Sequence, residues 1–526
     1  MELKLSLPAY PPIPKTGVET RAKQVQKWLD ELPLANSQEA GCKLVEAIAA
    51  LNSMKLGEEA RCNLLELYRA TACKLLPSLQ QLYLGKSLPL SEKSQQAAAL
   101  MRELFSELAN GYKKTLVDLS VRHVDLAANK ITVLAMARAI ECLGAVLEVF
   151  YETYAPATAR IWSELYRLYW YAAKLNIHDE TIAGSDIGSI NSVFIKVLLL
   201  ALADPYRLLQ GQLAEIKAYL AQFGQQALLQ SLGPTENKHG LFLVRLDGGM
   251  PPKALMHYQG VTDARTDIIL NTIPLARILH QQVQALDAGT AVVALGLPAG
   301  AWQPGYREML KRLIKQWGVA PKRMFNRVPS QADARVCGGI AALQHMLSAE
   351  ELASGATEID EQFTVEVSDV LHSTGSQLSY NCSKWVVVNE SAGGVALSKN
   401  PQSYAKLKVG DIIGVAAGES GLWGVGQVRW MQSDIENRVE VGVQMLAPNA
   451  EAVALKPVIT AANALFQPAL LLPEVPALKQ PARIIAARGS FQAQREFEVR
   501  AQGLIHLVRA DKLIEQTDSF DLFTFY

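Results

Sequence analysis

Two arginines four positions apart are the first residues in this sequence that suggest ligand chemistry. Arg323 and Arg327 are followed by Val328-Pro329, and a proline restricts the residue before it to an extended conformation. Pro321 precedes them, so the helix predicted to end near Trp317 should not continue through them. A guanidinium group on such an extended segment donates a rigid fork of hydrogen bonds to phosphate oxygens or to O6 and N7 of guanine, and it also stacks on bases.

A turn motif further along the chain supplies complementary polar groups. Asn389, Ser391, Gly393 and Gly394 occur in the sequence Asn-Glu-Ser-Ala-Gly-Gly between two apolar segments. The Asn389 amide can pair with a base edge, and the Ser391 hydroxyl can bond the turn or a base. The two glycines allow close approach of backbone and ligand and permit positive φ. Each motif alone has a plainer interpretation, in which the arginines are solvated linker charges and residues 389–394 only form a hairpin turn.

The composition of the chain excludes several classes of protein. The 526 residues include 51 Lys and Arg and 51 Asp and Glu, so the formal charge is zero, which argues against a general binder of nucleic-acid polymers. Hydrophobic residues make up 49% of the chain, enough to form the cores of several domains. Six cysteines without Cys-x-x-Cys spacing predict neither a disulfide scaffold nor a metal site, and we interpret them as buried free thiols.

The apolar segments predict a protein without a membrane span. The N-terminus lacks the apolar segment of a signal peptide. The most apolar run, Val193–Ala203, is too short to cross a bilayer and ends at Asp204-Pro205, so we interpret it as a buried helix. We therefore expect a cytoplasmic soluble protein.

The predicted fold class is multidomain α+β. Residues 1–235 show apolar residues at three- and four-residue steps, with proline breaks spaced for helical hairpins of a solenoid-like bundle. An aromatic stripe between Ile161 and Tyr171 is interpreted as helix–helix core. Residues 236–318 predict a small α/β domain, with strands near 241–246, 254–258 and 267–270 and helices near 273–286 and 306–317.

The remaining chain has the pattern of antiparallel β-structure. Residues 319–450 contain short strands separated by glycine-rich turns, which predict a closed barrel. Residues 451–526 are predicted to be a linker and a β-rich C-terminal segment, because prolines recur between 448 and 481. One further hypothesis pairs this last segment with strands from 240 to 270 in a second, discontinuous barrel.

The order of the two motifs, and of the strands after them, resembles the PilZ domain, a bacterial receptor module for cyclic di-GMP. The resemblance covers roughly residues 319–448, and the long helical N-terminal part is also similar to that of certain multidomain proteobacterial PilZ proteins. It implies that the barrel binds cyclic di-GMP without a cofactor and without catalysis. The implied ligand-binding residues are Arg323, Arg327, Asn389, Ser391, Gly393 and Gly394.

Two departures from the PilZ pattern affect the site. The motifs are separated by 62 positions, and residues 336–383 lack Lys and Arg, so an insertion of about 30 residues interrupts the first strand pair. We interpret this insertion as an acidic segment exposed to solvent. The alternative is that it is a segment that docks a protein partner. Arg335 is a substitute candidate if the insertion shifts the register. The acids of the segment are Glu350, Glu351, Glu358, Asp360, Glu361, Glu366 and Asp369.

Two functions remain open from the sequence. In the first, the chain is a non-enzymatic receptor that couples cyclic di-GMP binding at the barrel to an unidentified protein partner of the helical region. In the alternative, it is a PilZ-fold interaction scaffold that binds no nucleotide. An enzyme is disfavoured, because the sequence contains no phosphate-binding P-loop, no H-E-x-x-H motif and no G-x-S-x-G motif.

Overall fold

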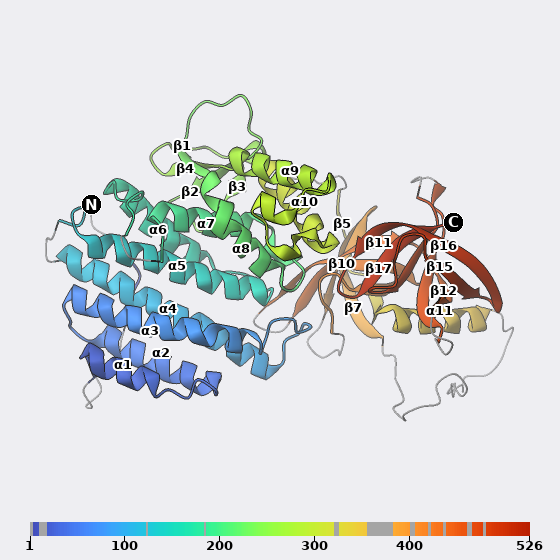
Figure 1. Cartoon of the computed structure of the whole chain (residues 1–526), viewed down its shortest axis with the longest axis horizontal. Helices are drawn as coiled ribbons and strands as arrows, with labels where there is room; N and C mark the ends of the chain where they lie inside the picture. The colour runs from blue at the N-terminus through green and yellow to red at the C-terminus, as the bar shows by residue number, and fades with distance from the viewer. Residues whose placement is uncertain are drawn as a thin grey trace. The chain divides into compact units, whose positions relative to one another are not determined.

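The computed structural model divides the chain into two compact units (Figure 1). The first comprises Met1–Lys86 and Leu90–Lys322, and the second comprises Ser87–Pro89 and Arg323–Tyr526. The structure describes residues 4–9, 18–121, 125–182, 186–319, 326–354, 382–399, 406–418, 422–434, 438–459, 465–476 and 480–526, without the side chains of 349–354.

Among the described residues, eight α-helices form the first part of the first unit, and successive helices pack in layers (Figure 1). This arrangement confirms the predicted helical hairpin bundle. Pro77 does not end its helix, which continues for one more turn to Gln80. The helices are α1 (Ala22–Asp30), α2 (Ser37–Ser53), α3 (Glu58–Gln80), α4 (Glu92–Val121), α5 (Lys130–Glu152), α6 (Ala159–Lys174), α7 (Ile190–Leu202) and α8 (Gln212–Phe223).

The aromatic stripe and the apolar run both lie in the core of this bundle. Trp162, Tyr166 and Tyr169 of α6 are buried, and the Tyr169 ring stacks on Phe194 of α7 with centroids 4.2 Å apart. Such a pair adds about 0.5–1.5 kcal/mol to the burial of its area. Both interpretations as helix–helix core are therefore confirmed. Within the described residues, no helix combines the length and the apolar character needed to cross a membrane.

The α/β part belongs to the same unit as the helices. Its four strands form a sheet of their own in the order β1-β4-β2-β3, so the hypothesis that they share a barrel with the C-terminal segment is wrong. The Trp317 indole donates a hydrogen bond to the Leu199 carbonyl at 3.1 Å, which ties this part to α7. The elements are β1 (Leu228–Ser231), β2 (Leu241–Arg245), β3 (Lys253–Ala254), β4 (Asp267–Asn271), α9 (Ile273–Asp287) and α10 (Pro304–Gly318).

The second unit begins with the predicted barrel, whose six strands close through the pairs β7–β6, β6–β9, β9–β10, β10–β11, β11–β8 and β8–β7. A short strand, β5 (Val328–Pro329), adds to β7 beside β6. The barrel strands are β6 (Asp333–Gly338), β7 (Ser383–Ser391), β8 (Gly394–Lys399), β9 (Ile412–Ala417), β10 (Gly424–Ser433) and β11 (Val439–Ala447).

A second closed barrel follows, built from the C-terminal residues alone in the order β12-β13-β14-β17-β16-β15. The interpretation of residues 448–481 as a connection is wrong, because they contain β12 and β13. Their prolines are tolerated at the strand margins: Pro457 ends β12, and Pro468 precedes the pairing of β13 with β14. The strands are β12 (Glu451–Pro457), β13 (Gln467–Leu472), β14 (Arg483–Ala487), β15 (Glu496–Ala501), β16 (Leu504–Gln516) and β17 (Phe520–Phe525).

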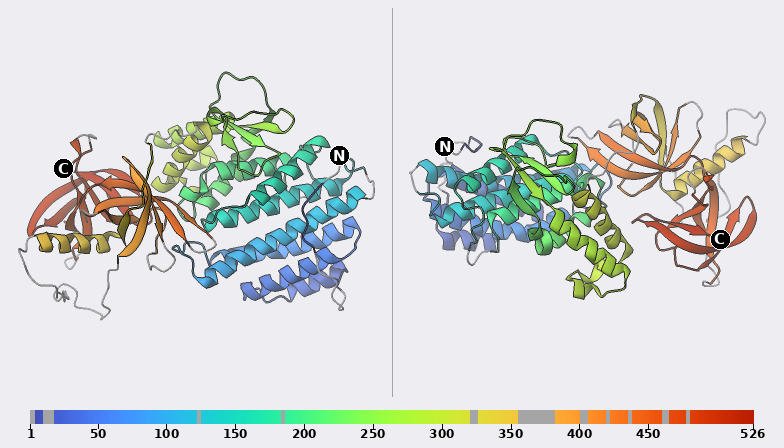
Figure 2. Two further views of the ribbon diagram at one scale, coloured as in Figure 1. Left: turned by 180° about the vertical axis from the view of Figure 1, so that it is seen from behind. Right: turned by 90° about the horizontal axis from the view of Figure 1, so that it is seen from above.

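The insertion between β6 and β7 begins with a helix, α11 (Ile340–Ser354), that lies between the two barrels (Figure 2). Leu343 and Leu347 are buried in a core that includes residues of both barrels, and the Gln344 amide donates to the Val453 carbonyl at 2.8 Å. The expectation that the insertion is exposed to solvent is therefore wrong for this helix. Residues 355–381, with five of the seven acids, lie outside the described residues, as do the side chains of Glu350 and Glu351.

A pair of side-chain contacts also joins the barrels. Arg429 of β10 binds Glu515 of β16 through both carboxylate oxygens, at 2.7 and 2.9 Å. The two barrels therefore share a core and a bidentate ion pair, which makes them one structural body.

The cysteines are free thiols, but not all are buried. Cys62, Cys142 and Cys337 are buried, as expected from the sequence, and Cys73 is half-buried, whereas Cys42 and Cys382 are exposed. The expectation is wrong for these two because each lies outside a packed face: Cys42 points outward from α2, and Cys382 precedes β7.

Candidate ligand-binding site

The turn motif forms the tight hairpin that joins β7 to β8. Ser391 pairs with Gly394 across a two-residue turn, and the Ser391 hydroxyl donates to the Gly394 carbonyl at 3.1 Å. A register shift between Val387 and Asn389 makes Val388 an extra residue in β7. Such a bulge re-aims the side chains that follow it, here that of Asn389, which is half-buried.

The short strand β5 brings Arg327 beside this hairpin. Pro329 lies opposite Asn389, and Val328 lies opposite Glu390. Continuing this register by one residue places Arg327 opposite Ser391, and opposed residues of an antiparallel pair share a face. Alternation along the strand puts Arg327 on the same face as Pro329 and therefore as Asn389.

Arg327 is exposed, and it makes no hydrogen bond or ion pair within the part of the chain that the structure describes. The structure thus brings Arg327 together with Asn389, Ser391 and the two glycines at one end of one barrel. Arg323 lies outside the described residues. The roles of these residues in binding stay predictions. Sequence reasoning missed the element that makes the juxtaposition, because a two-residue strand has no periodic pattern.

The glycines act differently from what the sequence suggests. Neither Gly393 nor Gly394 has a positive φ, so the backbone freedom that glycine permits is not used at either position. A Cβ atom at Gly394 would lie 2.1 Å from the Val443 carbonyl oxygen of β11. Glycine is needed there for two strands to approach each other, and this contact fixes the base of the hairpin.

The substitute candidate, Arg335, lies elsewhere on the barrel. It is opposite Lys384 in β7 and Ala416 in β9, and its guanidinium stacks on the Trp423 ring at 5.3 Å. It is therefore engaged with an aromatic side chain away from the hairpin, and it does not replace Arg327.

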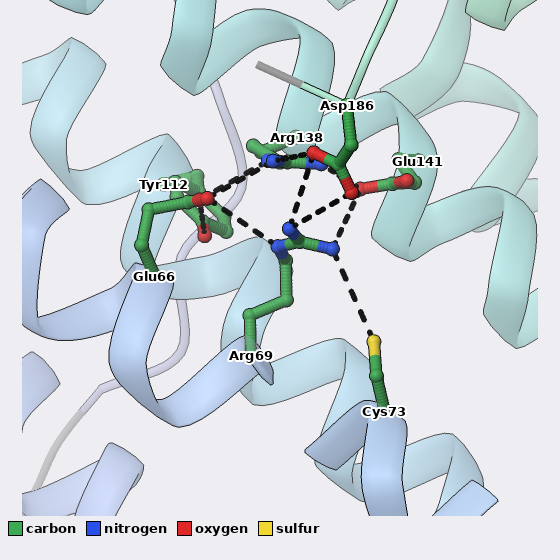
Figure 3. A network of polar contacts seen from close by, with 7 residues as sticks. All are labelled: Glu66, Arg69, Cys73, Tyr112, Arg138, Glu141 and Asp186. Carbon is green, nitrogen blue, oxygen red and sulfur yellow. Dashed lines mark hydrogen bonds and ion pairs between the residues drawn. The ribbon is translucent and has the colours of Figure 1, made fainter. Parts of the chain in front are cut away.

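A second cluster of charges lies in the helical bundle and is centred on Arg138 (Figure 3). Arg138 of α5 is buried and binds both carboxylate oxygens of Glu66 at 3.1 and 3.0 Å, Glu141 at 2.9 Å and Asp186 at 2.5 Å. The Tyr112 hydroxyl donates to Glu66 at 2.5 Å. The hydrogen bond from Arg138 lowers the pKa of Asp186. These contacts join α3, α4, α5 and the segment before α7.

Arg69 completes this cluster from α3. Its guanidinium lies 3.5 Å from Glu66, 3.9 Å from Glu141 and 3.3 Å from Asp186, and the Cys73 sulfur is 3.9 Å away. Every carboxylate of the cluster therefore faces a guanidinium group. No sequence motif predicts this cluster, because its residues come from separate helices.

Two cavities flank α5 beside the cluster. One, of about 240 Å³, is lined mainly by α5, α7 and α8, and the other, of about 300 Å³, mainly by α3, α4 and α5. Both are bordered by Glu141, Glu148 and Lys217, and Lys217 forms an ion pair with Glu148. The helical unit thus offers a mixed apolar and charged concave surface.

Comparison with known proteins matches three regions of the chain. Family models match residues 23–235 as the N-terminal domain of the cyclic-di-GMP receptor FimW, residues 351–452 as its middle PilZ domain and residues 453–526 as its C-terminal β-barrel domain. The PilZ match begins after β6, so it does not include the arginine segment.

The chain belongs to the PilZ-domain proteins that carry a long helical N-terminal region. More particularly, the three matches are to the N-terminal, middle and C-terminal domains of the cyclic-di-GMP receptor FimW, in that order along the chain. A protein of that name from Pseudomonas aeruginosa strain PAO1 is 25% identical, over 96% of this chain and 90% of that protein.

Proposed function

We propose that this protein is a non-enzymatic receptor for cyclic di-GMP, and that the nucleotide binds between the Arg323–Arg327 segment and the Asn389–Gly394 hairpin. One observation supports this site: Arg327 is exposed, has no hydrogen bond or ion pair among the described residues, and directly precedes β5, whose Pro329 lies opposite Asn389. The PilZ match and the receptor name of the Pseudomonas aeruginosa relative support the ligand.

The chemistry of the site suits a cyclic dinucleotide. Such a ligand presents two phosphates and two guanines, so it offers acceptors both to a guanidinium fork and to an amide. A hydrogen bond to a charged group contributes about 1.5–3 kcal/mol before ordering costs. The barrel segment 319–450 carries 10 basic and 14 acidic residues, so the affinity depends on the local arginines rather than on a general positive field.

The output of binding is assigned to the helical unit. We propose that this unit engages a protein partner, and that the protein acts in the cytoplasm. The cavities beside α5 support this role, because they provide a concave surface that the helical packing leaves unfilled. The alternative scaffold, which binds no nucleotide, predicts partner binding that is insensitive to cyclic di-GMP.

Calorimetric titration of cyclic di-GMP into the full chain tests the receptor. Wild type should bind, and Arg327→Ala should bind at least tenfold more weakly. Arg438→Ala is the matched control, because Arg438 is an exposed barrel arginine at the start of β11, away from the hairpin. Absence of heat with wild type would contradict the receptor and leave the scaffold. Equal affinity of wild type and Arg327→Ala would place the nucleotide elsewhere.

A further inference from the structure

The hairpin of β15 and β16 has an open edge of five residues. Residues 504–508 of β16 pair with β15 on one side, and pairing with β17 begins only at Arg509, which exchanges two backbone hydrogen bonds with Tyr526 at 2.8 and 3.0 Å. Within the described parts of the chain, no strand pairs with residues 504–508 on that second side. Leu504, Ile505 and Leu507 are 64%, 55% and 66% exposed.

The geometry of the hairpin shows which backbone groups face this open edge. The two-residue turn Gln502–Gly503, with positive φ at both residues, makes Ala501 and Leu504 a hydrogen-bonded pair. Antiparallel ladders alternate, so Ile505 and Leu507 direct their N–H and C=O groups away from β15, as Arg509 does toward Tyr526. Four backbone groups are therefore available along the edge.

The side chains on this edge are those that edge strands normally avoid. Natural sheets protect open edges with charged residues, prolines or bulges. The sequence Leu-Ile-His-Leu-Val of residues 504–508 contains no acidic residue, lysine, arginine or proline. The edge is thus suited to pairing with another strand.

We propose that this edge pairs antiparallel with the same edge of a second copy of the chain, with the two-fold axis between the two His506 residues. Ile505 then lies opposite the partner subunit's Leu507, and Leu504 lies opposite the partner subunit's Val508. Because Ile505 and Leu507 both direct their backbone groups outward, this register forms four intermolecular hydrogen bonds. Apolar residues are then opposed on both sides of the pair of His506 residues at the axis.

The backbone groups favour this register over its neighbours. A register that opposes Ile505 to the same residue of the second copy would set Leu507 opposite the partner subunit's Gly503, which lies in the turn. A register that opposes Leu507 to the same residue would set Ile505 opposite the partner subunit's Arg509, whose N–H and C=O groups are already bonded to Tyr526. Either shift therefore pairs fewer outward backbone groups than the register centred on His506.

The size of the contact makes the dimer reversible. Five residues a side bury less than the roughly 1,200–2,000 Å² of stable complexes. None of the nucleotide-site residues lies on this edge, so the inference goes beyond the proposed receptor function and does not depend on it.

Analytical ultracentrifugation of the full chain tests the dimer over about 1–200 µM, a range that brackets a micromolar dissociation constant. The average mass of wild type should rise with concentration from 57.4 kDa toward twice that value. Leu507→Pro removes an outward N–H without removing a bond to β15, and it should weaken association at least tenfold. Ile459→Lys, at a 95% exposed residue elsewhere on the barrel, is the control and should associate as wild type does.

A charge pair makes the test specific for the register. Ile505→Lys and Leu507→Asp should each remain monomeric, whereas a mixture of the two variants should associate, because positions 505 and 507 face each other across the axis. A wild type that stays at 57.4 kDa throughout the range would overturn the proposal. So would a dimer that persists in Leu507→Pro, or a mixture that stays monomeric.

Discussion

Arginine side chains gather in two regions of this protein and have opposite surroundings. In the helical unit, Arg138 is buried and each nitrogen of its guanidinium donates a hydrogen bond to a carboxylate of Glu66, Glu141 or Asp186 (Figure 3). At the end of the first barrel, Arg327 is exposed and has no partner in the described part of the chain. The same chemical group thus holds helices together in one region and is available to a ligand in the other.

The difference shows that the surroundings of a guanidinium, rather than its presence, decide its role. A desolvated arginine must be paired, because an uncompensated buried charge costs several kcal/mol. An arginine in water has no such requirement, and its hydrogen bonds become available when a phosphate or a guanine arrives. Substitutions in the two regions should therefore separate stability from affinity.

The largest effect is expected from Arg138→Met. This change leaves Glu66 and Asp186 without their principal partner in a partly desolvated cluster, so the free energy of unfolding of the helical unit should fall by about 3–5 kcal/mol. Urea denaturation followed by circular dichroism measures it, since helices dominate that signal in the first unit. The affinity of the barrel for cyclic di-GMP should not change.

Arg265→Met is the control for this substitution. Arg265 binds Asp263 at 2.7 Å in the same unit, but its side chain is 87% exposed. An exposed pair contributes about 0–1 kcal/mol, so this variant should unfold like wild type. Equal destabilisation by the two substitutions would contradict the claim that a buried arginine pair contributes more to stability than an exposed one.

Gly394→Ala should have the next largest effect, and it connects stability to binding. The added methyl group would overlap the Val443 carbonyl oxygen, which belongs to backbone and cannot move independently of β11. Overpacking of this kind costs about 1–3 kcal/mol. We expect a lower thermal midpoint of the barrel unit together with weaker nucleotide binding.

Gly300→Ala provides the comparison for Gly394→Ala, because no atom lies within 4 Å of a Cβ placed at Gly300. It should leave both quantities unchanged. A Gly394→Ala protein with wild-type stability would show that β8 and β11 are farther apart than the structure places them.

Asn389→Asp should affect affinity alone. The replacement removes the amide donor and adds a negative charge near the expected phosphates, so the dissociation constant for cyclic di-GMP should rise at least tenfold, about 1.4 kcal/mol. Glu390→Gln, at the exposed neighbour on the opposite face of β7, should bind as tightly as wild type. The unfolding midpoint of both variants should match wild type, and a weakened Glu390→Gln variant would contradict the assignment of faces.

The parts of the fold with a long periodic pattern could be predicted from the sequence. Helix α7 ends where Asp204-Pro205 interrupts the apolar run, and strands β7 to β11 follow the glycine-rich turns. The Asn389–Gly394 hairpin was also predicted, although the steric reason for Gly394 was not.

Other features depend on tertiary contacts that no local pattern encodes. Helix α11 was not predicted, because the acidic composition of residues 336–383 indicates an exposed segment. Its apolar face is instead buried between two barrels. Strands β12 and β13 were not predicted, because the prolines of residues 448–481 indicate a connecting segment. Prolines at the margins of strands do not break a ladder of backbone hydrogen bonds. The Arg138 cluster and β5 arise only when distant segments pack together.

The smallest effect concerns Glu152, a carboxyl group of α5 that has no guanidinium partner among the residues that the structure describes. Its hydrogen bonds come from the neutral Tyr83 hydroxyl at 2.8 Å and the Gln80 amide at 3.0 Å. Burial raises the pKa of Glu152 from 4.5 to about 7. The protonated form is therefore favoured in the folded state, and the free energy of unfolding should fall as the pH rises from about 4.5 to about 7 and change little above that.

We expect this fall to be on the order of 1 kcal/mol, because the carboxyl group retains some contact with solvent, which screens the effect. Glu152→Gln keeps an acceptor for Gln80 but does not titrate, so it should remove the slope and unfold at a higher urea concentration than wild type at pH 8. Urea denaturation at pH 5, 6, 7 and 8 measures the difference between the two proteins. An unchanged slope would mean that Glu152 is already ionised, and that a carboxylate of the helical unit tolerates partial burial without the guanidinium that Glu66 and Asp186 require.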